Sequence, residues 1–499
     1  MMADKTEFET QSYTSIFKAT SLFGGVQVYQ IIIQVIRSKF IAVLLGTQGV
    51  GIQGLLLSAT QLVQNVTSLG LSQSAVRDVS EVGSTRDEQG ISKTAAVINK
   101  LSFYTGIIGM MIMMAISPFL SKWTFGNNDY TFSFIILSSI IFFDQIAGGQ
   151  KAIIQGLRRL RDLAKASAVG ATIGLLLSVP LYYLFGIQGI VPTLVLHSLT
   201  SLLLIGFFYR RIRIVKHHIP VKESLKMGYS MMKMGVAMSI SSILVTVCSY
   251  VLRAYIRSVG GVDEVGLFTA GFMLMSTYTG LVFTAMSTDY YPRLASVNQD
   301  DKQCGIVINQ QAEIGLLILA PLLLICIVFM PLIVRILYSD SFLPANDYIV
   351  SSSIGMFFKI ASWSISYVFI AKGESRLFVI NEVISNSITL ALNIWGYRIY
   401  GLLGLGVSFS LSYLIYLIQV YIIAKVKYHF SFSLGFIRLF FIQLFLFASC
   451  LVLVIESSSR HFVFYCLSIL LIILSLVFSL KEINKRTGIV SILLNKLGH

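Results

Sequence analysis

Apolar segments long enough to cross a bilayer recur along the whole chain, and they decide what it can fold into. A transmembrane helix needs about 20 consecutive, mostly apolar residues. The chain has 499 residues, of which 55% are hydrophobic and only 12% charged, whereas soluble proteins carry about 25% charged residues. The sequence therefore predicts an all-α, polytopic membrane protein with about fourteen membrane-spanning helices. The expected spans are 16–45, 50–76, 95–120, 130–152, 163–185, 189–209, 229–257, 265–291, 305–337, 346–371, 376–397, 402–424, 435–455 and 461–480.

Basic residues divide the loops between these spans into two groups. Most of the 38 lysines and arginines, including the run 210–226, lie on the side that also holds both chain ends. Because lysine and arginine accumulate in cytoplasmic loops, we expect both termini in the cytoplasm. This bias explains most of the net charge of +15, so the charge does not indicate a nucleic-acid partner. The loops on the other side are too short to form the outer domain that a membrane glycosyltransferase needs.

The two halves of the chain resemble each other at an offset of 215 residues. Gly46 and Gly186 recur as Gly261 and Gly401 in matching loops. Each copy holds six spans, so both copies enter the membrane in the same direction, as in parallel repeats related by an axis along the membrane normal. We expect two six-helix bundles related by a pseudo-two-fold axis, followed by two extra C-terminal helices.

The repeat also predicts how the chain is divided. The expected parts are a cytoplasmic N-terminus (1–15), an N-lobe (16–209), a basic cytoplasmic linker (210–228), a C-lobe (229–424), the two extra helices (435–480) and a cytoplasmic tail (481–499).

The first span carries a line of polar side chains along one face. At 100° per residue, Gln30, Gln34 and Arg37 lie within about 80° of Gln27. Lipid does not tolerate such a face, so it must contact protein or water. Similar lines run along the spans 50–76, 229–257 and 265–291. We expect the four faces to line a hydrated cleft between the bundles; the alternative is tight packing through small residues and interhelical hydrogen bonds.

The larger polar side chains on these faces are candidate substrate ligands. They are Arg37, Arg253, Arg257, Gln27, Gln30, Gln34, Gln61, Asn65, Ser242 and Ser249. A guanidinium can bind two phosphate oxygens at once, so an anionic lipid headgroup is the natural ligand of the three arginines. The alternative is that the arginines extend toward the outer headgroups.

Other charged residues in the spans also recur at the offset of 215. Asp144 corresponds to Lys359, and Asp144 is the acid best placed for coupling to protons or cations; a structural ion pair is the alternative. Lys18 corresponds to Lys233, but helical phase turns both away from the polar lines, so we rank them lower, as anchors near the headgroups. Lys39 is also a lower-ranked site candidate. The sequence shows no nucleophile–base pair, nucleotide motif or metal-ligand cluster. We therefore expect neither enzymatic activity nor a cofactor or metal.

Several short motifs are similar to those of a known transporter family. They are residues 17–25, 37–39 followed by 44–46, 49–51, 70–77 and 153–156. In these stretches, and diffusely over nearly the whole chain, the sequence resembles the polysaccharide flippases of the multidrug/oligosaccharidyl-lipid/polysaccharide (MOP) exporter superfamily, specifically O-antigen translocases of the Wzx type.

The resemblance implies a V-shaped pair of six-helix bundles that work by alternating access. It implies transport of an undecaprenyl-diphosphate-linked oligosaccharide across the bacterial inner membrane, with Arg37 and Arg253 matching by position the cations that hold the diphosphate. The implied partners are this lipid-linked oligosaccharide, membrane lipids, and polysaccharide polymerase and chain-length regulator proteins. Two alternatives stay open: an ion-coupled drug or metabolite antiporter of the same superfamily, and a membrane polysaccharide polymerase or glycosyltransferase.

Overall fold

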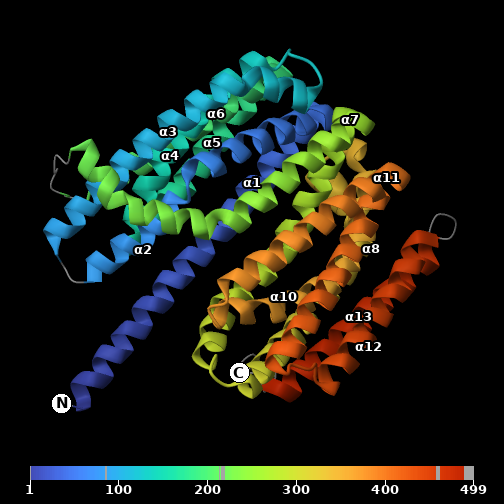
Figure 1. The fold of residues 1–499 in the computed structure, drawn as a ribbon. Helices are drawn as coiled ribbons and strands as arrows, with labels where there is room; N and C mark the ends of the chain where they lie inside the picture. Colours follow the sequence, from blue (N-terminus) through green and yellow to red (C-terminus); the bar gives the residue numbers. More distant parts are fainter. Residues whose placement is uncertain (1, 85–86, 213, 215–219, 457–460, 488–499) are drawn as a thin grey trace, which may run out of the picture. The chain divides into compact units, whose positions relative to one another are not determined.

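The computed structural model describes residues 2–84, 87–212, 214, 220–456 and 461–487, and this part of the chain is helical, without strands (Figure 1). Its elements are α1 (Met2–Ser68), α2 (Leu71–Ser84), α3 (Glu88–Phe125), α4 (Thr131–Gly156), α5 (Leu160–Phe185), the short 3-10 helix η1 (Gly186–Gly189), α6 (Ile190–Arg210), α7 (Val221–Ser296), α8 (Asp301–Leu337), the 3-10 helix η2 (Asp340–Phe342), α9 (Ala345–Ser353), α10 (Gly355–Ala371), α11 (Ser375–Tyr428), α12 (Leu434–Glu456) and α13 (His461–Thr487).

The predicted number of spans is confirmed once the long helices are divided. In the described part of the chain, nine helices are long and apolar enough to cross a membrane, and α9 with α10, bent by 51°, forms a tenth. Four of the nine are 41 to 54 residues long and overlap two predicted spans each. At 1.5 Å per residue, 41 residues reach about 60 Å, twice the thickness of the hydrocarbon core. Counting these four twice gives the fourteen predicted spans.

Each of these four long segments is interrupted by a glycine in a conformation that other residues rarely adopt. Gly46 (φ 65, ψ −166) divides α1, and Gly261 (φ 88, ψ 180) divides α7. Gly186, after α5, has φ 54 and ψ −132, and Gly401, inside α11, has φ 56 and ψ −135. Both pairs are 215 residues apart, so equivalent positions share the same unusual backbone. This agreement supports the predicted duplication.

The contacts group the chain into two compact units, which we call unit 1 (Met1–Val265) and unit 2 (Gly266–His499). The residues of α7 up to Val265 therefore pack with α1 to α6. The division into an N-lobe (16–209) and a C-lobe (229–424) remains a prediction about the repeat.

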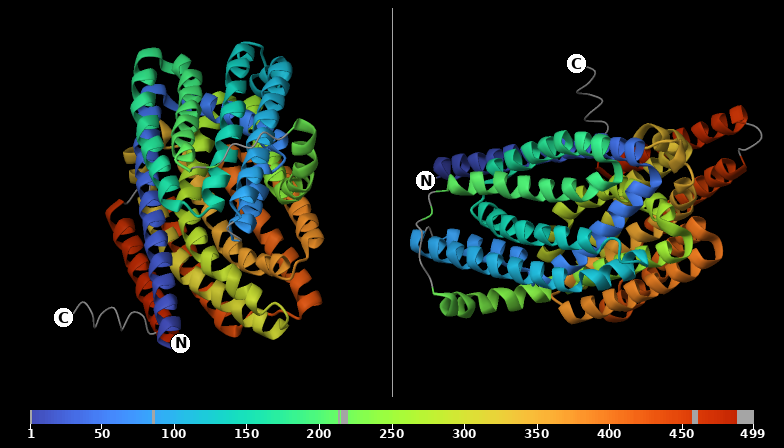
Figure 2. Two further views of the ribbon diagram at one scale, coloured as in Figure 1. Left: turned by 90° about the vertical axis from the view of Figure 1, so that its left-hand side faces the viewer. Right: turned by 90° about the horizontal axis from the view of Figure 1, so that it is seen from above.

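The helices of unit 1 pack as close neighbours. α4 lies against α2, α3 and α6, and α5 lies against α1 and α6 (Figures 1 and 2). The predicted span 50–76 is interrupted, because α1 ends at Ser68 and a separate amphipathic helix, α2, begins at Leu71. Leu71, Ala75 and Val79 recur every four residues on its buried face, beside the buried Ile153 of α4. This packing holds the polar edge of α2 beside α4.

Candidate functional site

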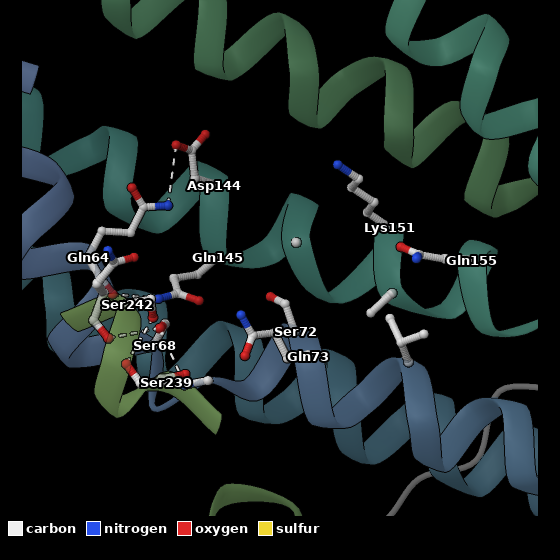
Figure 3. A pocket seen from close by; sticks show the side chains of 15 residues that line it. Gln64, Ser68, Ser72, Gln73, Asp144, Gln145, Lys151, Gln155, Ser239 and Ser242 are labelled. Carbon is white, nitrogen blue, oxygen red and sulfur yellow. Dashed lines mark hydrogen bonds between the residues drawn. The ribbon is translucent and has the colours of Figure 1, made fainter. Parts of the chain in front are cut away.

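A cavity of about 560 Å³ lies inside unit 1, between α1, α2, α4 and the first part of α7. This volume is within the range of about 300–1,000 Å³ that is typical of small-molecule sites. Its polar lining comes from Gln64, Asn65 and Ser68 of α1, Ser72 and Gln73 of α2, Asp144, Gln145, Lys151 and Gln155 of α4, and Ser239 and Ser242 of α7 (Figure 3).

The face of α4 that lines the cavity is set by residue spacing. Asp144, Gly148, Lys151 and Gln155 follow one another at intervals of four, three and four residues, so they lie on one side of the helix. Gly148 lies close to α2, because a Cβ atom there would come within 2.9 Å of the Ser72 hydroxyl. The glycine thus lets α2 approach α4 without filling the cavity.

Asp144 is the acid of this cavity and is held by two donors. The Ser198 hydroxyl of α6 donates to Asp144 Oδ1 at 2.5 Å, and the Gln64 amide donates to Asp144 Oδ2 at 3.4 Å. Figure 3 shows Gln64 of α1 reaching toward the carboxylate. The Gln145 amide donates in turn to the backbone carbonyl of Gln64 at 3.5 Å. The half-buried carboxylate therefore links α4 and α6 to the last turn of α1.

The break between α1 and α2 forms one wall of the cavity. Leu69 (φ 49) and Gly70 (φ 63) both have left-handed backbone conformations. A Cβ atom on Gly70 would lie 2.0 Å from the carbonyl oxygen of Gly235, and one on Gly235 would lie 2.4 Å from that of Leu69. Only glycine allows this approach at either position. It places α7 against the break, so that Ser239 and Ser242 reach the cavity.

Three predicted site residues line this cavity: Asn65, Asp144 and Ser242. The Asn65 amide donates to the Thr246 hydroxyl of α7 at 2.9 Å, so two of the four predicted polar faces meet here. The sequence prediction missed the contribution of α4. Its signal was present, since Lys151 and Gln155 continue the helical face of Asp144.

The three predicted arginines are not among the described residues that line the cavity. Arg257 donates to the carbonyls of Thr124 and Trp123 at 2.8 and 3.2 Å, where it satisfies the C-terminal end of α3. Arg253 donates to the hydroxyl and, at 3.2 Å, the carbonyl of Ser249, one turn earlier in α7.

Arg37 is the third predicted arginine. It is half-buried, and its Nε is enclosed without a hydrogen-bond partner in the described part of the chain. It lies near enough to His197 of α6 to act on it electrostatically. A buried guanidinium N–H without an acceptor is costly, so Arg37 retains capacity for an anion.

The remaining predicted residues occupy varied settings. Gln34, Gln61 and Lys233 are exposed, and Gln30, Lys39 and Ser249 are half-buried; the side chains of Lys18 and Gln27 lie outside the described residues.

In unit 2, Lys359 Nζ lies 5.2 Å from the ring centre of Phe283, 5.3 Å from that of Tyr413 and 6.0 Å from that of Phe409. The counterpart of Asp144 is thus a cation among aromatic rings.

No group of three histidines, cysteines or carboxylates in the described ranges could hold a metal ion. The described lining of the cavity therefore offers hydrogen bonding from amides and hydroxyls, the carboxylate of Asp144 and the cation of Lys151.

Comparison with known proteins identifies the family to which the chain belongs. A family model described as "Polysaccharide biosynthesis protein" matches residues 16–298, more than half of the chain. The chain belongs to this family. It is 20% identical over 388 residues to the lipid III flippase of Escherichia coli (strain K12), covering 76% of this chain and 90% of the flippase. It is 21% identical over 379 residues to a Shigella flexneri protein named "Putative O-antigen transporter", covering 74% and 88%.

Solved structures show the same fold. The lipid II flippase MurJ in an inward closed conformation superposes with a TM-score of 0.67 at 14% identity, covering 93% of this chain and 99% of MurJ. An inward-facing multidrug resistance MATE family transporter of the MOP superfamily superposes with a TM-score of 0.67 at 13% identity, covering 80% and 94%.

These matches confirm the predicted family and fold class. The chain is a multi-pass membrane protein of polysaccharide biosynthesis with the fold of MOP transporters. The relatives named here are transport proteins, which agrees with the prediction that the chain is not an enzyme.

Proposed function

We propose that this protein is a flippase that moves an undecaprenyl-diphosphate-linked oligosaccharide from the cytoplasmic to the outer leaflet of the bacterial inner membrane by alternating access. The observation that carries the proposal is the polar cavity among the membrane helices of unit 1. Polar groups inside a membrane protein are costly unless they meet water, protein or a polar ligand. A polar cargo with a lipid tail supplies such a ligand, and the named relatives include a lipid III flippase.

In this proposal the arginines bind the diphosphate. Arg37 is the strongest candidate because its Nε is enclosed without a described acceptor and its other guanidinium nitrogens donate to no described residue. Arg253 ranks second, since its guanidinium contacts Ser249 of its own helix. Arg257 ranks third, because two of its donors already bind carbonyls of α3. Asp144 is the proposed coupling acid. The proposal also has both termini in the cytoplasm. Its protein partners are polysaccharide polymerase and chain-length regulator proteins.

The test is reconstitution in vesicles with a fluorescent lipid-linked oligosaccharide whose appearance in the opposite leaflet is measured over time. We expect Arg37→Ala to slow transport about 10- to 100-fold, since a hydrogen bond to a charged group contributes about 1.5–3 kcal/mol. Arg37→Lys keeps the charge but not the planar fork, so it should be intermediate. Arg398→Ala removes an exposed arginine and is the matched control. Wild-type rates in Arg37→Ala would remove Arg37 from the site.

The same assay separates the other functions. A drug or metabolite antiporter would leave the labelled lipid in place and would move a small cationic compound instead. A polymerase or glycosyltransferase would change the covalent structure of the sugar. Transport of the intact lipid is the result that supports the flippase.

A further inference from the structure

Amides and hydroxyls are the commonest side chains in the lining of the unit 1 cavity. Five of its fifteen lining residues carry amides and four carry serine hydroxyls, whereas Val76 and Ala152 supply its apolar side chains. Amides and hydroxyls each both donate and accept hydrogen bonds. The hydroxyl groups of a sugar have the same dual character, so this lining matches a neutral polyhydroxylated ligand.

Other classes of ligand fit the lining less well. Drug-like molecules bind in pockets with mainly apolar and aromatic walls, and this cavity is lined by no aromatic residue in the described ranges. A phosphate group is usually held by several cations, whereas Lys151 is the cation among the described lining residues.

Some of the amides are committed to the protein, and others are available to a ligand. The side-chain nitrogens of Gln64 and Asn65 donate to Asp144 and Thr246, so these two residues shape the wall. Gln73 of α2 and Gln155 of α4 are exposed, and neither side-chain amide forms a hydrogen bond to another residue that the structure describes. Available hydrogen-bonding groups therefore come from two helices on the same cavity.

The cavity is also long enough for a saccharide. Its lining on α4 extends from Asp144 to Gln155, eleven residues or about 16 Å along the helix axis. This length exceeds that of a single pyranose ring.

We propose that this cavity is a carbohydrate subsite, in which Gln73 and Gln155 form hydrogen bonds to sugar hydroxyls of the lipid-linked headgroup. The inference rests on the proposed flippase function and adds to it a location for the sugar, separate from the arginines proposed for the diphosphate.

The test measures binding of two lipids to the full-length protein in nanodiscs. One lipid is undecaprenyl diphosphate, which carries no sugar. The other is the lipid-linked oligosaccharide extracted from cells in which this protein is inactivated. Two variants are compared with the wild type: the double variant Gln73→Ala, Gln155→Ala and the single variant Arg37→Ala. Gln48→Ala is the matched control, because Gln48 is exposed and is not a lining residue.

We expect the double glutamine variant to weaken binding of the oligosaccharide lipid about 10-fold and to leave undecaprenyl diphosphate unchanged. Gln48→Ala should change neither. Unchanged binding of the oligosaccharide lipid, or equal loss for both lipids, would overturn the subsite. If the wild-type protein binds neither lipid, the proposed function is refuted. If Arg37→Ala loses binding of both lipids while the double glutamine variant loses none, the proposed function is supported and the subsite is refuted.

A second measurement follows the accessibility of the cavity to a reagent. Gln73→Cys is labelled with a water-soluble maleimide in the presence and absence of the free oligosaccharide released from the same lipid, and the parent protein gives the background from Cys466, which is exposed. Protection by the oligosaccharide supports the subsite, and equal labelling rates contradict it.

Discussion

Asp144 receives hydrogen bonds from Ser198 and Gln64, and it is the residue on which ion coupling can be tested. If transport is coupled to protons or cations at this carboxylate, Asp144→Asn should abolish the stimulation of transport by an imposed gradient, because an amide keeps the size but not the charge. The rate is measured in vesicles with and without a pH or sodium gradient.

The matched control is Asp129→Asn, which removes an exposed acid from the loop before α4. It should respond to the gradient like the wild type. A gradient response that survives in Asp144→Asn would place coupling at another residue.

Glu374, in the turn before α11, gives a pH prediction outside the membrane spans. The Lys427 ammonium donates to it and holds the pKa of the carboxyl below its usual 4.5. Because the folded pKa is depressed, this contact stabilises the protein above pH 4.5 and is lost as the pH falls through the lower folded value. We expect Glu374→Gln to cost less than about 1 kcal/mol at pH 7, as for other exposed ion pairs.

The measurement compares melting temperatures of wild type and Glu374→Gln in detergent at pH 7 and at low pH. The difference should shrink as the carboxyl is protonated. A difference that persists unchanged at pH 3 would show that the ion pair is not its cause.

Residue positions on a helix face could be predicted from the sequence, but their neighbours could not. Helical phase predicted a polar face that includes Asn65, which lines the cavity, because phase depends on local geometry alone. Asp144 was singled out by its charge inside a span. It could not show that Arg257 would meet the carbonyls of α3, since that contact joins residues 133 positions apart. Gln73 was missed because it lies near the end of its predicted span, 50–76, and Gln155 because it lies three residues beyond the end of its predicted span, 130–152.

Among the helices, the breaks are the features that recur. Arg158 (φ 56) and Gly373 (φ 74) are a third pair of left-handed residues 215 positions apart, after α4 and α10. Apolar length predicted the spans well because each span needs only its own composition. The interruption at Leu69 and Gly70 was not predicted, since it depends on the approach of Gly235 from α7.

That approach makes Gly235→Ala the sharpest test of a helix contact. The new Cβ would lie 2.4 Å from the Leu69 carbonyl oxygen, so α7 must move away from the break. We expect a loss of about 1–3 kcal/mol in unfolding free energy, as for other overpacked sites. Thermal unfolding in detergent measures it.

Gly280→Ala in the same helix is the control, because no atom of a described residue lies within 4 Å of its Cβ position. It should be neutral, or stabilising by up to about 1 kcal/mol through helix propensity. Equal effects of the two substitutions would contradict the close contact.

For the whole molecule, the charge bias predicts which side each loop occupies. In a variant whose five cysteines are replaced by alanine, Asn128→Cys should react with an impermeant maleimide in intact cells, whereas Gln299→Cys should react only after the membrane is opened. Both positions are exposed, so access depends on the side of the membrane. The reverse pattern would place both termini outside.

The break at Leu69 and Gly70 also has a consequence for amide exchange with solvent. The first N–H groups of a helix have no intrahelical acceptor, and those of Gln73 and Ser74 reach back to the Gly70 carbonyl at 3.1 and 3.3 Å. Inside an apolar span, the amides of Leu71 and Ser72 therefore begin a new helix beside a polar cavity. In deuterated buffer they should exchange far faster than amides in the middle of α4, marking where water enters the bundle.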